Sequence, residues 1–325
     1  MADWFVRVRL TRIDPLDLNL FEFDYDLTFT VFFLNAEEKV YARYGGRDAE
    51  NPDRRQSLAG LQYTMESVLR MHERDDKAFA PKVQEAPRFI RDVSSFGRVG
   101  RCLHCHQVKE ILNTKSKTGK SNQELAWRYP LPENIGLELE VDRGNVIKDV
   151  KARSPAAVAG LKAGDVVQRL NGVPIHSFAD TQLALDRAPQ AGSIEIGWQR
   201  GDEVLKDKLS LTEGWRKTNI TWRPSMLRLV PSARLYGADL TDEEKKVLGL
   251  TAKQLAFRQQ NSVPSQAQAA GVRGGDVILG LDGKDLEMDV IGFLRYVGRS
   301  YLVGDQVTVN LLRDGKRLDL KMTLR

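Results

Sequence analysis

A repeated phrase in the second half of the chain constrains its fold more than any other feature. Residues 159–167 read AGLKAGDVV, and residues 270–278 read AGVRGGDVI. A turn-forming pair follows in each copy, Asn171-Gly172 in the first and Asp282-Gly283 in the second. Such pairs favour tight hairpins because both residues accept a positive φ. The sequence therefore predicts two copies of one strand-rich domain.

Each copy also predicts the same order of elements: a strand, a short helix, a strand, a longer helix and two closing strands. The longer helices are expected at 177–187 and 288–301. The closing strands are expected at 193–199, 203–211, 306–312 and 317–324. Asp165 and Asp276 precede strands, where an aspartate commonly accepts hydrogen bonds from nearby backbone. We assign them a structural role.

The repeated phrase resembles that of PDZ domains, in the circularly permuted form attached to bacterial HtrA-type proteases. The resemblance implies that a loop of apolar-Gly-apolar sequence binds the carboxylate of a peptide C-terminus, and that the peptide adds as a strand beside it. It places peptide contacts at Ile135, Gly136, Leu137, Tyr236, Gly237 and Ala238. It lines the side-chain pockets with Phe178, Leu183, Leu185, Val290, Phe293 and Leu294. In the alternative, either groove is degenerate and packs against its neighbours.

A C-x-x-C-H pentad precedes the repeats and contains both cysteines of the chain, Cys102 and Cys105. This spacing is typical of covalent haem attachment, in which both thiols bond to the porphyrin and the adjacent histidine binds the iron. The sequence thus predicts a c-type haem on Cys102 and Cys105, with His106 as the proximal ligand. The sixth ligand stays open among Met65, Met71, His72, His176 and Met226.

The cysteine pair has other interpretations. It is compatible with a structural or redox-active disulfide. It also suits a zinc site, although a second ligand pair at the usual spacing is missing. A site without any cofactor is the remaining alternative.

The first 80 residues predict a smaller domain. Strands are expected at 4–11, 27–34 and 39–44, followed by a helix from Ser57 to about Arg74. The order resembles the C-terminal half of a thioredoxin fold. The half that would carry the redox dithiol is missing, so we expect no dithiol catalysis by this domain. Either the native chain starts upstream of Met1 or the domain is a degenerate docking remnant.

Length and composition favour a multidomain α+β protein. We expect a truncated thioredoxin-like domain at 1–80, a linker with the pentad at 81–130, and PDZ domains at 131–218 and 219–325. No apolar run is long enough for a membrane helix. The net charge is +5, with 49 Lys and Arg interspersed among 44 Asp and Glu. This mixture lacks the dense basic tract that nucleic-acid binding would require.

The arrangement as a whole resembles bacterial, planctomycete-type fusions of thioredoxin-like and PDZ domains. No Gly-x-Ser-x-Gly phrase is present and the four histidines suggest no Ser-His-Asp triad, so we predict a chain that is not a protease and favour one that is not an enzyme. The expected function is electron transfer or redox sensing by a haem protein whose PDZ pair docks a protein partner. The alternative is a non-catalytic PDZ adaptor. Haem attachment implies an extracytoplasmic location, whereas the lack of a signal peptide favours the cytoplasm.

Overall fold

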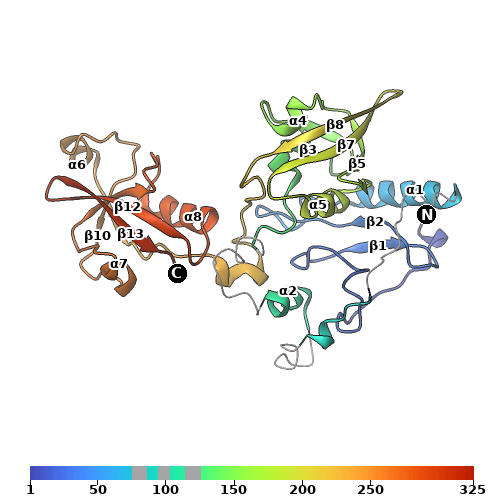
Figure 1. The fold of residues 1–325 in the computed structure, drawn as a ribbon, viewed down its shortest axis with the longest axis horizontal. Helices are drawn as coiled ribbons and strands as arrows, with labels where there is room; N and C mark the ends of the chain where they lie inside the picture. The colour runs from blue at the N-terminus through green and yellow to red at the C-terminus, as the bar shows by residue number, and fades with distance from the viewer. Residues whose placement is uncertain (75–85, 94–102, 114–125) are drawn as a thin grey trace. The chain divides into compact units, whose positions relative to one another are not determined.

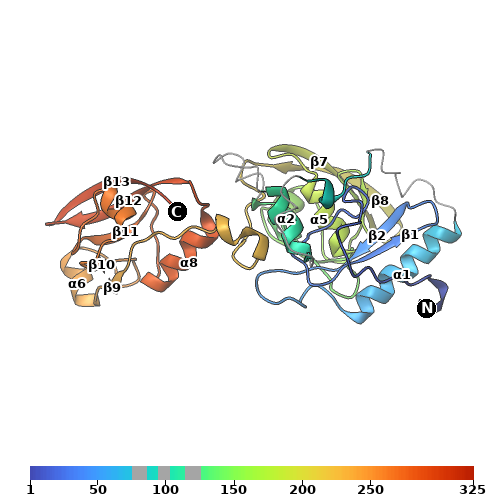
Figure 2. The same cartoon turned by 90° about the horizontal axis from the view of Figure 1, so that it is seen from below.

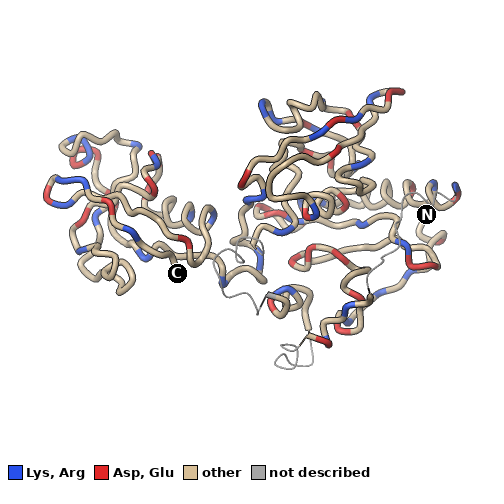
Figure 3. Tube along the Cα trace, viewed as in Figure 1, with Lys and Arg blue, Asp and Glu red and all other residues tan. Residues whose placement is uncertain are grey.

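A computed structural model describes residues 1–74, 86–93, 103–113 and 126–325. The chain divides into two compact units (Figure 1). The N-terminal unit comprises Met1–Ser116, Trp127–Thr218 and Trp222–Ser225, and the C-terminal unit comprises Lys117–Ala126, Asn219–Thr221 and Met226–Arg325. Basic and acidic residues are interspersed along both units (Figure 3). Among the described helices, none is long and apolar enough to cross a membrane.

The N-terminal unit begins with a short 3-10 helix, η1 (Ala2–Trp4), and a hairpin of β1 (Val31–Leu34) and β2 (Val40–Tyr44). Asn35 holds the hairpin turn, since its Oδ1 accepts from the N–H groups of Glu37 and Lys39. Helix α1 (Leu58–Glu73) starts at the cap Ser57, as predicted, because the Ser57 hydroxyl accepts from the Gly60 N–H. The hairpin and helix are thus confirmed, and a thioredoxin-like domain is not shown.

Two predictions for this region need correction. Residues 5–11 form no strand, and Val6 and Val8 are 95% and 74% exposed, because no neighbouring strand pairs with them. The described part of 81–130 is no detached linker either. It contains η2 (Ile90–Asp92) and α2 (Cys105–Asn113), and α2 buries Val108 and Ile111 against Phe23. The helix that follows the cysteines therefore belongs to the core of the N-terminal unit.

The first repeat forms two small sheets around one apolar core. One sheet pairs β3 with β4, and the other has the order β6-β5-β7-β8. The elements are η4 (Pro132–Ile135), β3 (Leu137–Leu139), β4 (Ile147–Val150), α4 (Pro155–Val158), β5 (Val166–Leu170), β6 (Val173–Pro174), α5 (Phe178–Asp186), β7 (Gly192–Arg200) and β8 (Glu203–Leu211). The core includes Leu137, Leu183 and Leu185. The predicted order of elements is confirmed.

The second repeat follows η5 (Pro224–Leu229) and forms a single sheet of order β13-β12-β11-β10-β9. Figure 2 shows β9 at the edge of this sheet, next to α8. The elements are β9 (Gly237–Asp239), α6 (Asp242–Val247), β10 (Phe257–Gln259), α7 (Ser265–Ala269), β11 (Val277–Leu281), α8 (Val290–Ser300), β12 (Gln306–Arg313) and β13 (Lys316–Thr323).

The two repeats share a buried aspartate that joins a turn to the last pair of strands. Asp165 accepts from the Lys162 N–H and from the Arg200 guanidinium. Asp276 accepts in the same way from the Arg273 N–H and from Arg313. The structure confirms the bracing role assigned to both aspartates, and it adds an arginine partner for each.

Candidate peptide-binding site

The sheet of the C-terminal unit ends on β9, whose outer edge pairs with no other described strand. The Gln260 N–H donates to the Tyr236 carbonyl, and the Leu240 N–H donates to Ala256, both at 2.9 Å. Because backbone groups alternate sides along an antiparallel strand, Gly237 directs its N–H and C=O to the open edge. Such an edge can accept an extended peptide as an added strand.

Helix α8 lies beside this edge and leaves apolar side chains uncovered. The Val290 N–H at its start donates to Asp239 Oδ1 at 2.9 Å, which ties the helix to β9. Ile291 is 54% exposed and Leu294 is half-buried. These two residues are three positions apart and share one side of the helix. We call Gly237, Asp239, Ile291 and Leu294 the β9–α8 face.

The loop before β9 differs from the predicted one. Gly237 lies within the strand without a positive φ, and a Cβ on it would stand 1.9 Å from the Arg258 carbonyl oxygen. This glycine therefore permits the close approach of β10. The residue with positive φ before the strand is Arg234, at 53°, between the buried Ala233 and Leu235. The left-handed residue before this strand is therefore Arg234, and Tyr236, Gly237 and Ala238 stay predicted peptide contacts.

In the first repeat the predicted loop has the expected conformation. Ile135 ends η4, Gly136 has a φ of 87°, and Leu137 begins β3. Ile135 and Leu137 are both buried. Every residue of the neighbouring helix α5 is buried as well, so the first repeat presents no counterpart of the β9–α8 face.

Cys102 of the C-x-x-C-H pentad lies outside the described residues. Cys105 begins α2, and its half-buried side chain packs against the apolar core, where burial raises the pKa of its thiol. His106 Nδ1 lies 3.0 Å from Glu110 Oε1 on the same helix. No group of three or more His, Cys, Asp or Glu residues suited to a metal ion occurs within the part of the chain that the structure describes.

Among the described residues, no contact joins His106 to a candidate sixth ligand of the N-terminal unit. Met65 and Met71 pack in the core of β1, β2 and α1, whereas α2 packs in a different cluster. His72 contacts the Tyr41 hydroxyl. Met226 is buried in the C-terminal unit.

His176 contacts a serine, which sequence reasoning did not anticipate. Its Nδ1 lies 3.0 Å from Ser67 Oγ on α1. Its Nε2 is buried without a hydrogen-bond partner, and burial lowers the pKa of the ring to about 4. A catalytic triad needs a carboxylate on the second ring nitrogen and a base near the working pH. This pair therefore has a structural role, joining α1 to the first repeat.

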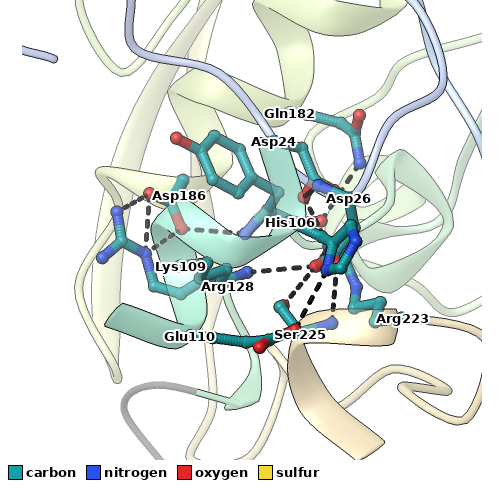
Figure 4. A network of polar contacts seen from close by, with 11 residues as sticks. Asp24, Asp26, His106, Lys109, Glu110, Arg128, Gln182, Asp186, Arg223 and Ser225 are labelled. Atoms are coloured by element: carbon teal, nitrogen blue, oxygen red, sulfur yellow. Dashed lines mark hydrogen bonds and ion pairs between the residues drawn. The ribbon is translucent and has the colours of Figure 1, made fainter. Parts of the chain in front are cut away.

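A buried charge network joins segments nearly 200 positions apart (Figure 4). Arg223 Nη1 lies 2.6 Å from Asp24 Oδ1 and 3.3 Å from Asp26 Oδ2. Lys109 of α2 approaches Asp26 Oδ2 at 3.7 Å, and burial, with the nearby Arg223, lowers the pKa of the lysine to about 8. The hydroxyl of Ser225 completes the set by donating to Asp26. The network fixes α2 and residues 222–225 to the N-terminal segment.

Comparison with known proteins identifies one module directly, since residues 146–200 match the family model of the PDZ domain. The chain contains a PDZ domain. It is also related to HtrA-type proteases. A probable periplasmic serine protease, do/HhoA-like, from Haemophilus influenzae is 26% identical over 65% of this chain and 39% of its own length. The periplasmic pH-dependent serine endoprotease DegQ of Escherichia coli is 30% identical over 45% of this chain and 30% of its own.

A solved structure of a serine-to-alanine variant of the HtrA-type protease AlgW, with a decapeptide, is 16% identical over 55% of this chain and 53% of that one. Its TM-score is 0.28, too low to indicate a shared overall fold. The chain spans less than two fifths of the length of either curated relative named above.

These relatives correct the predicted function. They are serine proteases, so the prediction of a non-proteolytic protein, and the preference for a chain that is not an enzyme, is wrong. The same finding overturns the interpretation as a haem protein of electron transfer or redox sensing, and the alternative of a non-catalytic adaptor. The PDZ resemblance is confirmed, whereas the thioredoxin-like fusion and the role of the pentad are not shown.

Proposed function

We propose that this chain takes part in proteolysis of the HtrA type, in the periplasm, and that it recognises its protein targets by their C-terminal peptides. The observation that supports this most directly is the β9–α8 face. There a strand edge that pairs with no other described strand runs beside a helix that exposes Ile291. The edge supplies backbone hydrogen bonds, and the helix supplies apolar contact for the side chains of the peptide.

The face predicts the kind of peptide. Ile291 and Leu294 are apolar, so we expect apolar residues near the end of the bound peptide. The backbone is left-handed at Arg234, just before the strand. We expect this segment, beside the edge of β9, to bind the terminal carboxylate through backbone N–H groups.

The binding experiment uses the full chain and a fluorescein-labelled decapeptide that ends in Leu-Leu-Val with a free carboxylate. We expect the C-terminal amide of the same peptide to bind at least tenfold more weakly, because it loses the charge-assisted hydrogen bonds of the carboxylate. Ile291→Asp should weaken binding at least tenfold. Val247→Asp is the matched control, since Val247 is an apolar residue of the same unit and is 86% exposed. Equal binding of acid and amide would contradict the proposal.

Proteolysis is measured with the same preparation. Denatured casein is incubated with the chain in the presence and absence of a serine-protease inhibitor, and the cleavage products are separated by mass. We expect inhibitor-sensitive cleavage that falls when Ile291→Asp weakens peptide binding. Cleavage at an unchanged rate, both with the inhibitor and in this variant, would refute serine proteolysis by this chain.

A further inference from the structure

The helices that correspond in the two repeats differ in exposure. All nine residues of α5 are buried, whereas α8 buries only Phe293, Val297 and Gly298 fully. A helix that receives a peptide must leave one side uncovered, because the peptide lies between it and the neighbouring strand. The first repeat therefore differs from the second in what covers its helix.

The hairpin of the N-terminal segment covers the first half of α5. Strand β2 lies against the helix (Figure 1). The Arg43 N–H donates to Asp180 Oδ1 at 3.0 Å, and the Ser177 hydroxyl donates to the Arg43 carbonyl. The N–H and C=O groups of Arg43 are thus both satisfied by the start of α5. This part of the helix is therefore occupied by a strand of the same chain.

The loop after β2 closes the side next to η4. The Arg55 guanidinium lies 5.2 Å from the centre of the Phe178 ring, and its Nη1 lies 2.6 Å from Glu133 Oε1. Arg55 Nε also donates to Asp48 at 2.7 Å. Gly46 packs so closely that a Cβ on it would stand 2.6 Å from Phe178 Cδ1. Arg55 therefore joins α5 to the turn that leads into β3.

The second half of α5 is covered by the segment just before η4. Gln182 Nε2 donates to the Tyr129 carbonyl at 3.1 Å. Asp186 accepts from the Tyr129 N–H at 2.8 Å, from Arg128 Nε at 2.7 Å and from Arg216 Nη2 at 3.2 Å. The Tyr129 side chain is itself buried in the core of the repeat. Both halves of the helix are therefore occupied by other parts of the same chain.

We infer that residues 43–55 and Arg128–Tyr129 occupy the peptide position of the first PDZ repeat, so that each chain binds one peptide, at the second repeat. The inference rests on the proposed function and deepens it, because it assigns recognition to one of two related sites. The hairpin acts as an internal cover of the first site. The ion pair between Arg55 and Glu133, together with the Arg128–Asp186 pair, holds this cover in place.

Calorimetric titration of the full chain with the unlabelled decapeptide ending in Leu-Leu-Val tests the inference. We expect one peptide per chain for the wild type and for Val247→Asp. For Ile291→Asp we expect at least a tenfold loss of affinity with no second site in its place. Two peptides per chain, or an Ile291→Asp variant that still binds one peptide as tightly as the wild type, would overturn it. A wild type that binds no peptide would instead refute the proposed function.

Hydrogen exchange gives a readout that needs no variant. In the free wild type, amides of α5 should exchange more slowly than those of the N-terminal half of α8, because other segments already cover α5. Addition of the peptide should slow exchange at β9 and α8 and leave β3 and α5 unchanged. Slower exchange at β3 or α5 on peptide addition would show an open first site and refute the internal cover.

Discussion

Replacing Arg223 by methionine tests the buried charge network. The Arg223, Asp24 and Asp26 side chains are each at most 1% exposed. Burial acts to raise the pKa of Asp24, but the neighbouring Arg223 and Lys109 outweigh it and hold this pKa below its usual value. Methionine fills much of the same volume and removes the charge. The two buried carboxylates would then share the positive charge of Lys109.

Removing one partner of a buried ion pair costs about 3–5 kcal/mol, because the charge left behind has no compensation. That is a large share of the roughly 5–15 kcal/mol that stabilises a domain. Urea unfolding of a unit of this size has a slope of about 2–3 kcal/mol per M. We therefore expect Arg223→Met to lower the urea midpoint of the N-terminal unit by about 1–2.5 M.

Tryptophan fluorescence reports on this unit alone, because all five tryptophans lie within its residue ranges, at positions 4, 127, 198, 215 and 222. Arg223→Met combined with Asp24→Asn is the control, since the double variant leaves one fewer uncompensated charge. It should regain roughly 1 kcal/mol or more relative to Arg223→Met. A single variant within about 0.5 kcal/mol of the wild type, the range of an ordinary surface substitution, would refute the reasoning.

Two further predictions concern the junction between α1 and the first repeat. Burial lowers the pKa of His176 from 6.5 to about 4. The neutral ring therefore contributes fully to the free energy of unfolding above pH 6.5, and this contribution is lost as the pH falls through 4. It amounts to about 3 kcal/mol. His176→Asn should reduce the fall of the urea midpoint between pH 7 and pH 4 relative to the wild type. The raised pKa of buried Asp180 acts in the opposite direction, to the same extent in both proteins. An equal dependence of the urea midpoint on pH in both proteins would contradict this. Gly60→Ala should destabilise the unit by about 1–3 kcal/mol, because its Cβ would stand 2.4 Å from the Val141 carbonyl oxygen. Gly197→Ala is the matched control, with a nearest contact of 3.7 Å, and an equal loss in both variants would count against a steric cause.

Local sequence signals predicted most of the second half of the chain. Asn171 and Gly172 have φ values of 47° and 78°, and Asp282 and Gly283 have 57° and 67°, as a hairpin turn with two left-handed residues requires. These turns, the glycines and the alternating strands are encoded within a few residues. The cap at Ser57 is a signal of the same local kind.

In the second repeat, the glycine of the predicted loop meets a different steric requirement from the one that the pattern suggests. Apolar-Gly-apolar sequence suits a left-handed turn, but it equally suits a strand that another strand approaches closely. At Gly237 the second reason applies, and Arg234 takes the left-handed position without being a glycine. A residue pattern alone does not state which steric requirement a glycine meets.

Contacts between distant segments gave no signal in the sequence. Arg223 and Asp24 are separated by 199 positions, and neither belongs to a recognisable motif. The same holds for Arg55 and Phe178, whose contact covers the first site. The cysteine pentad, by contrast, carried a strong local pattern, and it led to a function that the relatives contradict.

The unequal burial of α5 and α8 bears on how the two repeats can diverge over time. A substitution on α5 changes packing against β2, so it requires compensating changes elsewhere in the N-terminal unit. Ile291 on α8 faces no such requirement, because its exposed side chain contributes little to the core. We expect natural variation among descendants of this chain to concentrate on the exposed side of α8. Adaptation to new target peptides can then proceed there without loss of the fold.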